Sequence, residues 1–228
     1  MSYFANKTVV VLGATGILGQ LTAQDLRQRG ADVRLIVRSP NSLAAALRDL
    51  PVAVADITKR GEVAAALTAV SQGQSVDGII NCTGVVAFGN FSELSDEVAQ
   101  EVMAVNALGV INVISLATTS LNPEGFLASF TGVAADMTIA GMGAYCASKA
   151  AAKAAMGVAA RELRRQKIRV LDIRAPHTET GLITRALEGT APKMPEGLQP
   201  QAVIDRVLDA IAVGEKDLPA EAFAAQSN

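Results

Sequence analysis

A tyrosine and a lysine four residues apart could do proton chemistry if they share one face of a helix. The stretch YCASKAAAK runs from Tyr145 to Lys153 and is rich in alanine, which favours a helix. In a helix, residues four apart lie on the same face, so Tyr145 and Lys149 would be neighbours. A tyrosine hydroxyl has an ordinary pKa of about 10, and a nearby ammonium favours its anion. The pair could pass a proton to or from a substrate oxygen, although ordinary helix surface would show the same spacing.

A glycine-rich turn near the amino terminus could bind phosphate. The sequence GATGILG places Gly13, Gly16 and Gly19 between an apolar run and a helical pattern. In dinucleotide sites, such glycines allow a tight turn, approach of the backbone to the pyrophosphate, and close helix–strand packing. The helix N-terminus adds unpaired N–H groups and a partial positive charge. A plain strand-to-helix turn also favours glycine, but this context predicts a cofactor site.

The residues after the second apolar run favour NADP(H) over NAD(H). An NAD site usually has an acidic residue there, which binds the ribose hydroxyls. This chain has Arg38 and Ser39 instead. A guanidinium can bind a 2′-phosphate through its planar fork of donors. The alternative is a solvated arginine at the end of a strand.

The elements that must position these residues alternate along the chain. Apolar runs typical of buried strands occupy 7–12, 33–37, 52–55, 78–82, 126–131 and 168–173. Helical patterns occupy 16–29, 41–50, 60–71, 95–117, 142–166 and 201–212. This alternation predicts an α/β fold: a doubly wound parallel sheet of the Rossmann type, with six or seven strands and helices on both faces. We expect one domain over 1–228.

Composition excludes several other classes of function. The chain has 228 residues, 50% of them hydrophobic, and a formal net charge of −2, so a nucleic-acid partner is not expected. The apolar runs are too short for a bilayer span, and the amino terminus lacks signal-peptide features, so we expect a cytoplasmic protein with no membrane partner. Two cysteines without C-x-x-C spacing and a single histidine predict no metal site.

Several motifs together give the chain a family resemblance. GATGILG, Asp56 after the third strand, NCTG at Asn81–Gly84, Asn106 and YCASK occur in order. From about Thr8 to Ile211 the chain resembles the short-chain dehydrogenase/reductase family. The resemblance implies an NADP(H)-dependent oxidoreductase that transfers hydride between nicotinamide and the carbonyl or alcohol of a small, mostly apolar substrate. The alternatives are a sensor or signalling protein that only binds the cofactor, and non-redox isomerisation or elimination.

The resemblance also implies roles for individual residues. Tyr145 would be the acid/base group, Lys149 would bind the nicotinamide ribose, and Asn106 would support a proton relay through water. Asp56 would contact the adenine. The implied cofactor contacts are Gly13, Thr15, Gly16, Ile17, Leu18, Arg38, Ser39, Asp56, Ile57, Asn81, Cys82, Thr83, Gly84, Tyr145, Lys149, Pro176, Thr178 and Thr180.

One position departs from the family pattern. The family has a serine thirteen residues before the tyrosine, where it polarises the substrate carbonyl, and this chain has Gly132. Thr131 precedes it, but adjacent strand residues point to opposite faces unless the backbone turns. Three alternatives stay open: Thr131 donates after a local shift, Thr138 or a backbone N–H donates, or the protein binds cofactor and reduces carbonyls slowly or not at all. Losing one such donor can cost about 10²–10³ in rate.

A proline- and glycine-rich stretch at about 175–200 is a candidate substrate loop around a short helical piece at 180–187. Pro176-His177 replaces the family's proline-glycine, so His177 is either a second proton donor near the substrate or a side chain packed in the loop. The candidate pocket residues are Val85, Met137, Met142, His177, Leu182 and Ile183.

The ends of the chain bear on assembly. After residue 212 the sequence leaves room for only a short last strand, or none, which puts the family's usual tetramer in doubt. Small residues over 150–160 would permit close helix contact. We expect a homodimer through the helices at 95–117 and 142–166; ordinary packing within one chain is the alternative.

Overall fold

A seven-stranded parallel sheet forms the centre of the molecule. The structure is a computed structural model, and it describes residues 2–226. The strands are β1 (Thr8–Leu12), β2 (Asp32–Val37), β3 (Val52–Val54), β4 (Val76–Asn81), β5 (Leu121–Phe130), β6 (Arg169–Ile173) and β7 (Asp217–Leu218). Their order across the sheet is β3-β2-β1-β4-β5-β6-β7, and every pair is parallel. The prediction of a Rossmann-type α/β fold is confirmed.

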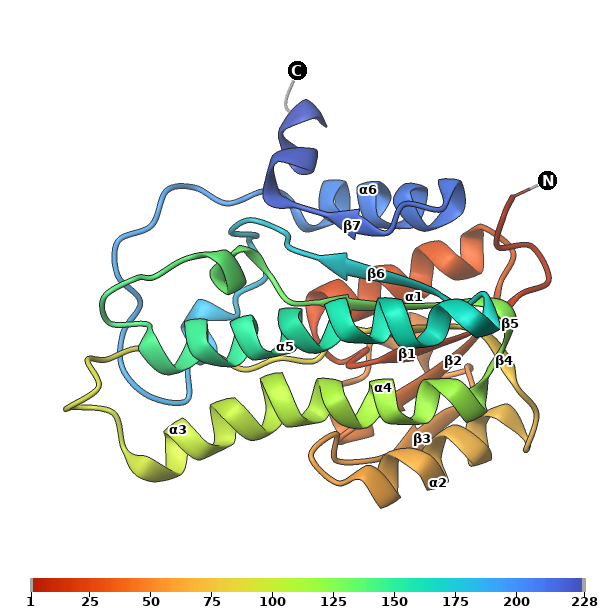
Figure 1. Cartoon of the computed structure of the whole chain (residues 1–228), viewed down its shortest axis with the longest axis horizontal. Coiled ribbons are helices and arrows are strands. Elements are labelled where there is room, and N and C mark those ends of the chain that lie inside the picture. The colour runs from red at the N-terminus through yellow and green to blue at the C-terminus, as the bar shows by residue number, and fades with distance from the viewer. Residues whose placement is uncertain (1, 227–228) are drawn as a thin grey trace.

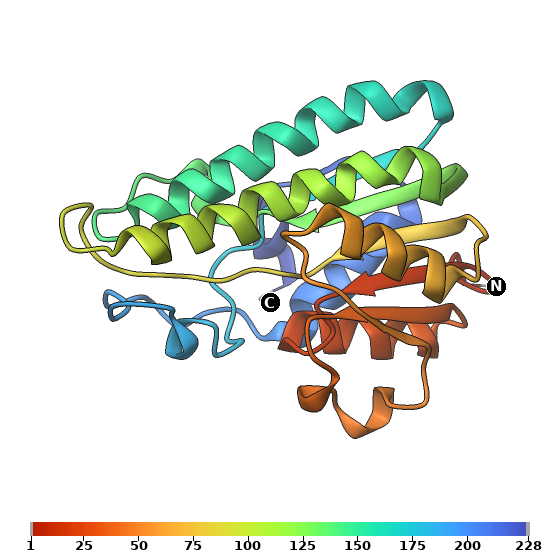
Figure 2. The ribbon, with the colours of Figure 1, turned by 90° about the horizontal axis from the view of Figure 1, so that it is seen from below.

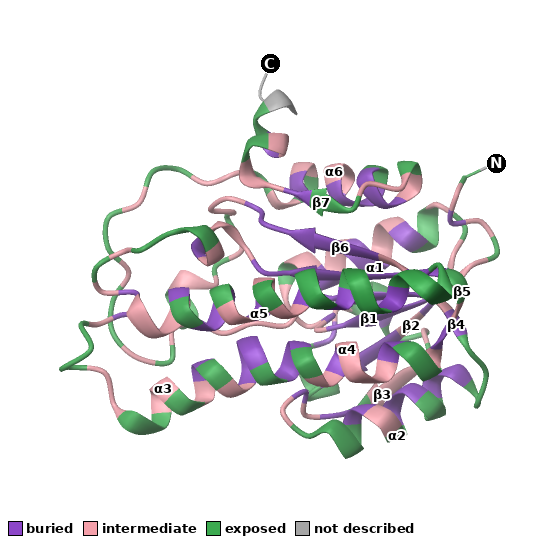
Figure 3. Ribbon diagram, in the orientation of Figure 1, coloured by how far each residue is buried: buried purple, intermediate pink, exposed green. Residues whose placement is uncertain are grey.

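Helices cover both faces of this sheet (Figure 2). The helices are α1 (Ile17–Gln28), α2 (Arg60–Ser71), α3 (Asp96–Met103), α4 (Gly109–Ser120), α5 (Gly143–Glu162) and α6 (Pro200–Val213). Residues of α1 and α6 share one buried cluster with the sheet, and residues of α2, α4 and α5 share another. The central strands are mostly buried, the edge strand β3 is not, and the outer faces of the helices are exposed (Figure 3). Covering on both faces explains why the strands are continuous apolar runs.

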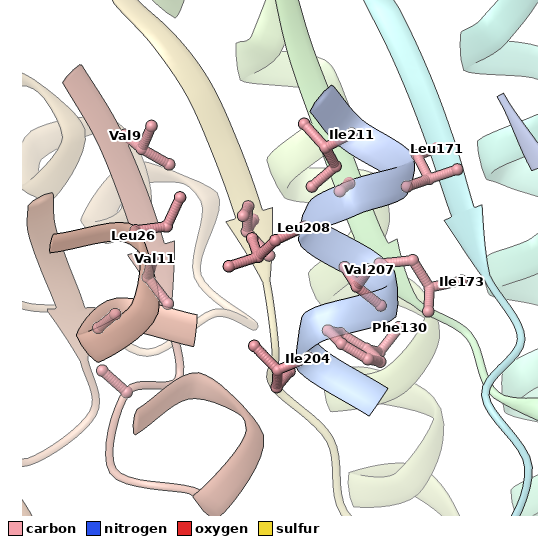
Figure 4. Packing of buried hydrophobic residues seen from close by; sticks show 14 of the residues in the cluster. Val9, Val11, Leu26, Phe130, Leu171, Ile173, Ile204, Val207, Leu208 and Ile211 are labelled. Atoms are coloured by element: carbon pink, nitrogen blue, oxygen red, sulfur yellow. The ribbon is translucent and has the colours of Figure 1, made fainter. Parts of the chain in front are cut away.

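The alternation of side chains along each strand divides the core into two layers. Val9 and Val11 face the α1/α6 side, and Val10 and Leu12 face the α2/α4/α5 side. On the first side, α6 lays a row of apolar residues across the sheet (Figure 4). That row consists of Ile204, Val207, Leu208 and Ile211.

Three expected helices differ from the structure. The stretch 41–50 forms two 3₁₀ turns, Pro40–Ser42 and Ala45–Leu47, because it buries too few side chains for a longer helix to gain by packing. The piece at 180–187 is reduced to one turn, Ile183–Arg185. The helix expected at 95–117 is built of α3, a π-helical turn at Ala104–Leu108, and α4.

The continuous helix from Asp96 to Ser120 is long and apolar. Its 25 residues would suffice for a membrane span by length and composition alone, a feature that the short apolar runs did not predict. Four of its side chains, Val105, Val110, Val113 and Ala117, are buried in the α2/α4/α5 cluster. Burial against the sheet therefore accounts for much of its apolar content.

The carboxyl ends of the strands meet at one edge of the sheet, and the long loops gather there (Figure 1). In open α/β sheets ligands bind at this edge. At the far side of the sheet, the last strand is only the two residues Asp217–Leu218, so the prediction of a short final strand is confirmed.

Candidate active site

The three glycines after β1 have different structural roles. Gly13 has a φ of +85°, and a Cβ there would lie 3.0 Å from the Thr83 backbone nitrogen. A Cβ at Gly19 would collide with the Gly13 carbonyl, so helix α1 can approach β1 only with glycine there. A Cβ at Gly16 would meet nothing closer than 3.6 Å. The fold thus requires Gly13 and Gly19, whereas Gly16 leaves open space in front of α1.

That space lies at the amino terminus of α1. Gly16 is the N-cap and offers no side-chain hydrogen bond to the helix. The first N–H groups of a helix have no partner within the helix, and their dipoles attract phosphate. Thr15 and Leu18 are half-buried beside this turn, and Ile17 is exposed. The turn therefore fits a pyrophosphate group.

The ends of β2 and β3 carry the residues expected at the adenosine end of a cofactor. Arg38 and Ser39 follow β2 and are exposed. Asp56 follows β3 and accepts hydrogen bonds from the Thr58 backbone nitrogen (2.9 Å) and hydroxyl (2.8 Å). Partial burial raises the pKa of Asp56, but these hydrogen bonds and the charges of Lys59 and Arg38 outweigh it and lower that pKa. Arg38 is therefore close enough to Asp56 for its charge to affect the pKa of that carboxyl.

Ile57 and Cys82 are two of the implied cofactor contacts, but their side chains face the protein interior. Ile57 is buried, and a Cβ at Gly109 would lie 2.9 Å from it. The Cys82 Sγ lies 3.8 Å from the Thr22 hydroxyl in α1, and burial raises the pKa of the Cys82 thiol to about 12. Only the backbone of these two residues is available for a cofactor.

The turn after β4 is fixed by Asn81. Its Nδ2 donates to the Ser129 hydroxyl (3.2 Å), and its Oδ1 accepts from the Thr83 nitrogen (3.1 Å) and hydroxyl (2.7 Å). Gly84 follows, and a Cβ there would lie 3.4 Å from both Asn106 Oδ1 and Lys149 Nζ. The absence of a side chain at Gly84 opens space directly beside these two polar groups.

Asn106 lies in the π-helical turn and joins this segment to α5. Its Oδ1 accepts from the Val85 nitrogen (2.9 Å), and its Nδ2 donates to the Val85 carbonyl (2.8 Å) and the Ser148 hydroxyl (3.0 Å). Ser148 in turn donates to the Tyr145 carbonyl (2.7 Å). Ser148 was not predicted, because nothing in YCASK except its place between Tyr145 and Lys149 marks it.

Tyr145 and Lys149 share one face of α5, as their spacing predicts. The Lys149 Nζ lies 5.8 Å from the Tyr145 ring centroid and donates to the Phe130 carbonyl at 3.0 Å. The ammonium is buried, and the hydrogen bond that it donates goes to the end of β5.

The titration of the pair differs from the sequence-based expectation. Desolvation, aided by Cys146, raises the pKa of Tyr145 to about 12. Burial lowers the pKa of Lys149 to about 8, although the charge of Asp172 acts in the opposite direction. The idea that the ammonium favours the tyrosine anion is wrong for this structure, because desolvation dominates for both groups. Tyr145 keeps its proton at neutral pH.

The hydroxyl of Thr131 points to Asp172 of β6, so its proton is not available to polarise a substrate carbonyl. The residue is fully buried, and its Oγ1 donates to Asp172 Oδ1 at 2.5 Å. The backbone does turn at Gly132, where φ is +78°. The Thr131 side chain nevertheless remains hydrogen-bonded to a residue of β6. A side chain at Gly132 would not collide with its neighbours. It would strain the backbone, because a φ of +78° favours glycine. Thr138 is exposed.

Three of the expected pocket residues pack in the same apolar cluster region as Tyr145. Met142 belongs to a buried apolar cluster with Val86 and Phe88, and Leu182, Ile183 and Tyr145 pack against that cluster. The loop is attached there by hydrogen bonds from Leu187 N to Val86 O and from Phe88 N to Glu188 O, both 2.9 Å.

Two other expected pocket residues lie elsewhere. Val85 packs against the α2/α4/α5 cluster, and Met137 is 44% exposed. The sequence could not separate them from the pocket, because each is an apolar residue in a loop at the correct edge of the sheet.

His177 packs within the loop. Its Nε2 lies 3.3 Å from Glu179 Oε1, and a Cβ at Gly197 would approach its ring to 2.8 Å. The hydroxyl of Thr178 donates to the Pro176 carbonyl (2.9 Å), and that of Thr180 accepts from the Leu182 nitrogen (3.3 Å). These contacts stabilise the loop and favour the packed alternative for His177.

Comparison with known proteins places this geometry in a family. The family model described as short chain dehydrogenase matches residues 7–190. The chain belongs to this family. An uncharacterised oxidoreductase of Methylorubrum extorquens is 30% identical over 90% of this chain and 86% of its own length. Dehydrogenase/reductase SDR family member 7B of Mus musculus is 26% identical over 95% of this chain and 74% of its own.

A solved structure shows the same likeness in three dimensions. A short chain dehydrogenase from Burkholderia cenocepacia, in complex with NADP, superposes with a TM-score of 0.83 at 26% identity. The match covers 99% of this chain and 92% of that one. The relatives are oxidoreductases by name, and the site described above lies at the edge of the sheet where this fold binds its ligands.

The buried Lys149 ammonium predicts a pH-dependent stability difference. From pH 8 to 10.5, the native protein has released the Lys149 proton and the unfolded chain still binds it, so wild-type stability rises with pH relative to Lys149→Met. The change is roughly 3 kcal/mol, since one pKa unit corresponds to about 1.4 kcal/mol. Urea unfolding of both proteins at several pH values measures it.

Lys153→Met, one turn further along α5 with its side chain 39% exposed, is the matched control. Loss of the Phe130 hydrogen bond shifts the Lys149→Met stability by an amount that does not depend on pH. A difference that stays constant from pH 7 to 10.5 would contradict the buried-ammonium description.

Proposed function

We propose that the chain is an NADP(H)-dependent oxidoreductase that acts on the carbonyl or alcohol group of a small, mostly apolar molecule. The observation that carries the proposal is that Lys149 and Asn106 border the space at Gly84, with Tyr145 beside Lys149 on the same face of α5. That space lies at the same edge of the sheet as the open turn at Gly16. The two features are what a dinucleotide with a reactive end requires.

A bound nicotinamide supplies the hydride chemistry, and the chain supplies binding and proton transfer. The 13–18 turn and the α1 N-terminus would hold the pyrophosphate, Asp56 would lie at the adenine end, and residues 81–84 would line the cofactor between them. Lys149 binds the ribose with its ammonium. Tyr145 is protonated at neutral pH and donates its proton to the oxygen of a carbonyl that is being reduced.

The polarising donor is the weak part of this site. Gly132 has no hydroxyl, and the Thr131 hydroxyl is occupied by Asp172. We propose that a backbone N–H or a substrate-side water takes this role and that turnover is correspondingly slow. The same observation favours a second candidate function, a sensor that binds NADP(H) without turnover.

The preference for NADP(H) rests on Arg38. Arg38 directly follows β2, its side chain is exposed, and the end of the strand carries no acidic residue. The charge of Arg38 contributes to lowering the pKa of Asp56. The Burkholderia cenocepacia relative binds NADP. A guanidinium at this position would pair with the 2′-phosphate.

We also propose a homodimer through α4 and α5. The face formed by α3, the π-helical turn, α4 and α5 exposes four apolar side chains, namely Met103, Leu108, Ile111 and Val158. Leu108 is 55% exposed. Analytical ultracentrifugation should give a dimer for the wild type and a monomer for Leu108→Glu; a wild-type monomer at micromolar concentration would contradict the proposal.

The first test of function is NADPH consumption across ketones, aldehydes and diketones. Wild-type protein should oxidise NADPH with at least one apolar ketone, and Tyr145→Phe should lower that rate by about 10²–10⁴ because it removes the proton donor. Tyr3→Phe is the matched control, since Tyr3 is the other tyrosine and contacts Arg169 far from the site.

The outcomes separate the two candidate functions. Loss of turnover in Tyr145→Phe alone supports the reductase. If NADPH binds but no substrate is turned over, or if Tyr145→Phe is as active as wild type, the reductase proposal fails and the sensor remains.

Arg38→Ala should weaken NADPH binding and leave NADH binding nearly unchanged. Removing one charged phosphate contact costs about 1.5–3 kcal/mol, or roughly 10–100-fold in Kd. Fluorescence titration with both dinucleotides measures it, with Arg164→Ala as the control, because Arg164 precedes β6 at the opposite edge of the sheet. Equal losses for NADPH and NADH would reject the 2′-phosphate contact.

A further inference from the structure

A buried charged pair lies at the carboxyl end of β6, beneath α5, and the proposed function does not use it. Asp172 and Arg174 are only 8% and 7% exposed. Asp172 belongs to a mostly apolar strand (RVLDI) and Arg174 directly follows it; charged groups are rarely buried in this way unless they are paired. Their alternation places Asp172 on the face of the sheet that α5 covers, next in line to Val170.

Each oxygen of Asp172 has a buried donor. Thr131 Oγ1 donates to Oδ1 at 2.5 Å, and Arg174 Nη1 donates to Oδ2 at 2.6 Å. Arg174 also binds Asp217 at 2.6 and 2.9 Å and lies 2.8 Å from Asp136 through Nε. Burial, with the charge of Asp217, raises the pKa of Asp172, and the hydrogen bonds from Thr131 and Arg174 offset part of that rise. The guanidinium at 2.6 Å is the group that favours the charged carboxylate.

Two consecutive residues, the last of β5 and the one after it, connect this carboxylate to the candidate active site. The Phe130 carbonyl accepts from Lys149 Nζ, and the next residue, Thr131, donates to Asp172. β5 and β6 also pair Ser129 with Asp172 in register. The ammonium and the carboxylate are thus attached to neighbouring positions of one strand end. The charge of Asp172 raises the pKa of Lys149 and opposes the effect of burial.

The other groups around Lys149 do not replace Asp172. The π-helical turn presents Asn106 and β4 presents Asn81, both neutral, and Tyr145 on α5 is protonated at neutral pH. Lys153, one turn along α5, and Arg174 carry the same sign as Lys149. Asp136 is bound by Lys153 and Arg174, and Asp217 is bound by Arg174 on the far side of the pair.

We propose that Asp172 is a positioning residue for the site: its carboxylate, fixed by Thr131 and Arg174 beneath α5, keeps Lys149 in the ammonium form. The inference rests on the proposed function for the role of Lys149 in binding the ribose. It also gives Thr131 a role, which is to orient Asp172 rather than to contact a substrate. Without Asp172, only burial would shift the pKa of Lys149, and burial lowers it. The proposed function requires this lysine to be charged.

The test measures Lys149 directly in the unliganded protein. The chain has seven lysines, so ¹³C labelling at Cε gives a spectrum in which Lys149→Arg identifies the Lys149 signal. Titration should show that Asp172→Asn, which is nearly isosteric, lowers the pKa of Lys149 by about one pH unit or more. Asp217→Asn removes another carboxylate from Arg174 and should leave Lys149 unchanged. An unchanged Lys149 in Asp172→Asn, or equal shifts in both variants, would overturn the proposal.

A second variant covers the case in which Asp172→Asn does not fold. Thr131→Val keeps the carboxylate and removes the hydroxyl that orients it, so it should lower the pKa of Lys149 by a smaller amount in the same direction. No shift in Thr131→Val would then reject the proposal. Neither titration requires substrate or cofactor, so a failure of the NADPH assay and a failure of this inference are separate results.

Discussion

The candidate site depends on a lysine ammonium that is buried at the carboxyl end of a parallel sheet. Burial of Lys149 lowers its pKa to about 8, so the surrounding groups decide whether it carries a charge. The Phe130 carbonyl binds its Nζ, and Asp172 supplies the opposing charge. These contacts come from β5 and β6, which the sheet must hold in register. The environment of Lys149 on α5 therefore depends on the pairing of β5 with β6 beneath it.

The same edge of the sheet is shaped by missing side chains. Gly13 and Gly19 allow α1 to begin close against β1, and Gly84 opens space beside Lys149 and Asn106. Asn106 has its side chain fully engaged with Val85 and Ser148, so it joins the segment after β4 to α5. Polar networks of this kind are rigid because every buried partner is satisfied. A rigid frame around an open space is what binding an extended dinucleotide requires.

The Thr131–Gly132 sequence shows how one turn can change the chemistry of a family site. Gly132 has a backbone conformation that favours glycine, and Thr131 directs its hydroxyl into the sheet. The position that polarises a carbonyl in the family pattern thus has no side chain here. The hydroxyl that remains has joined a buried ion pair instead. The proposed reductase would therefore have a proton donor in Tyr145 but no side-chain donor at position 132 to polarise the carbonyl.

The sequence by itself determined the α/β fold, the glycine turn and the shared helix face of Tyr145 and Lys149. Each of these follows from local spacing: apolar runs form buried strands, and a separation of four residues puts side chains on one helix face. Only the tertiary structure decided the direction of the Thr131 hydroxyl, the packing of His177 on Glu179, and the loss of the expected helix at 41–50. It also decided that desolvation controls both titrating groups, because burial and the approach of Asp172 from β6 depend on contacts between residues far apart in sequence.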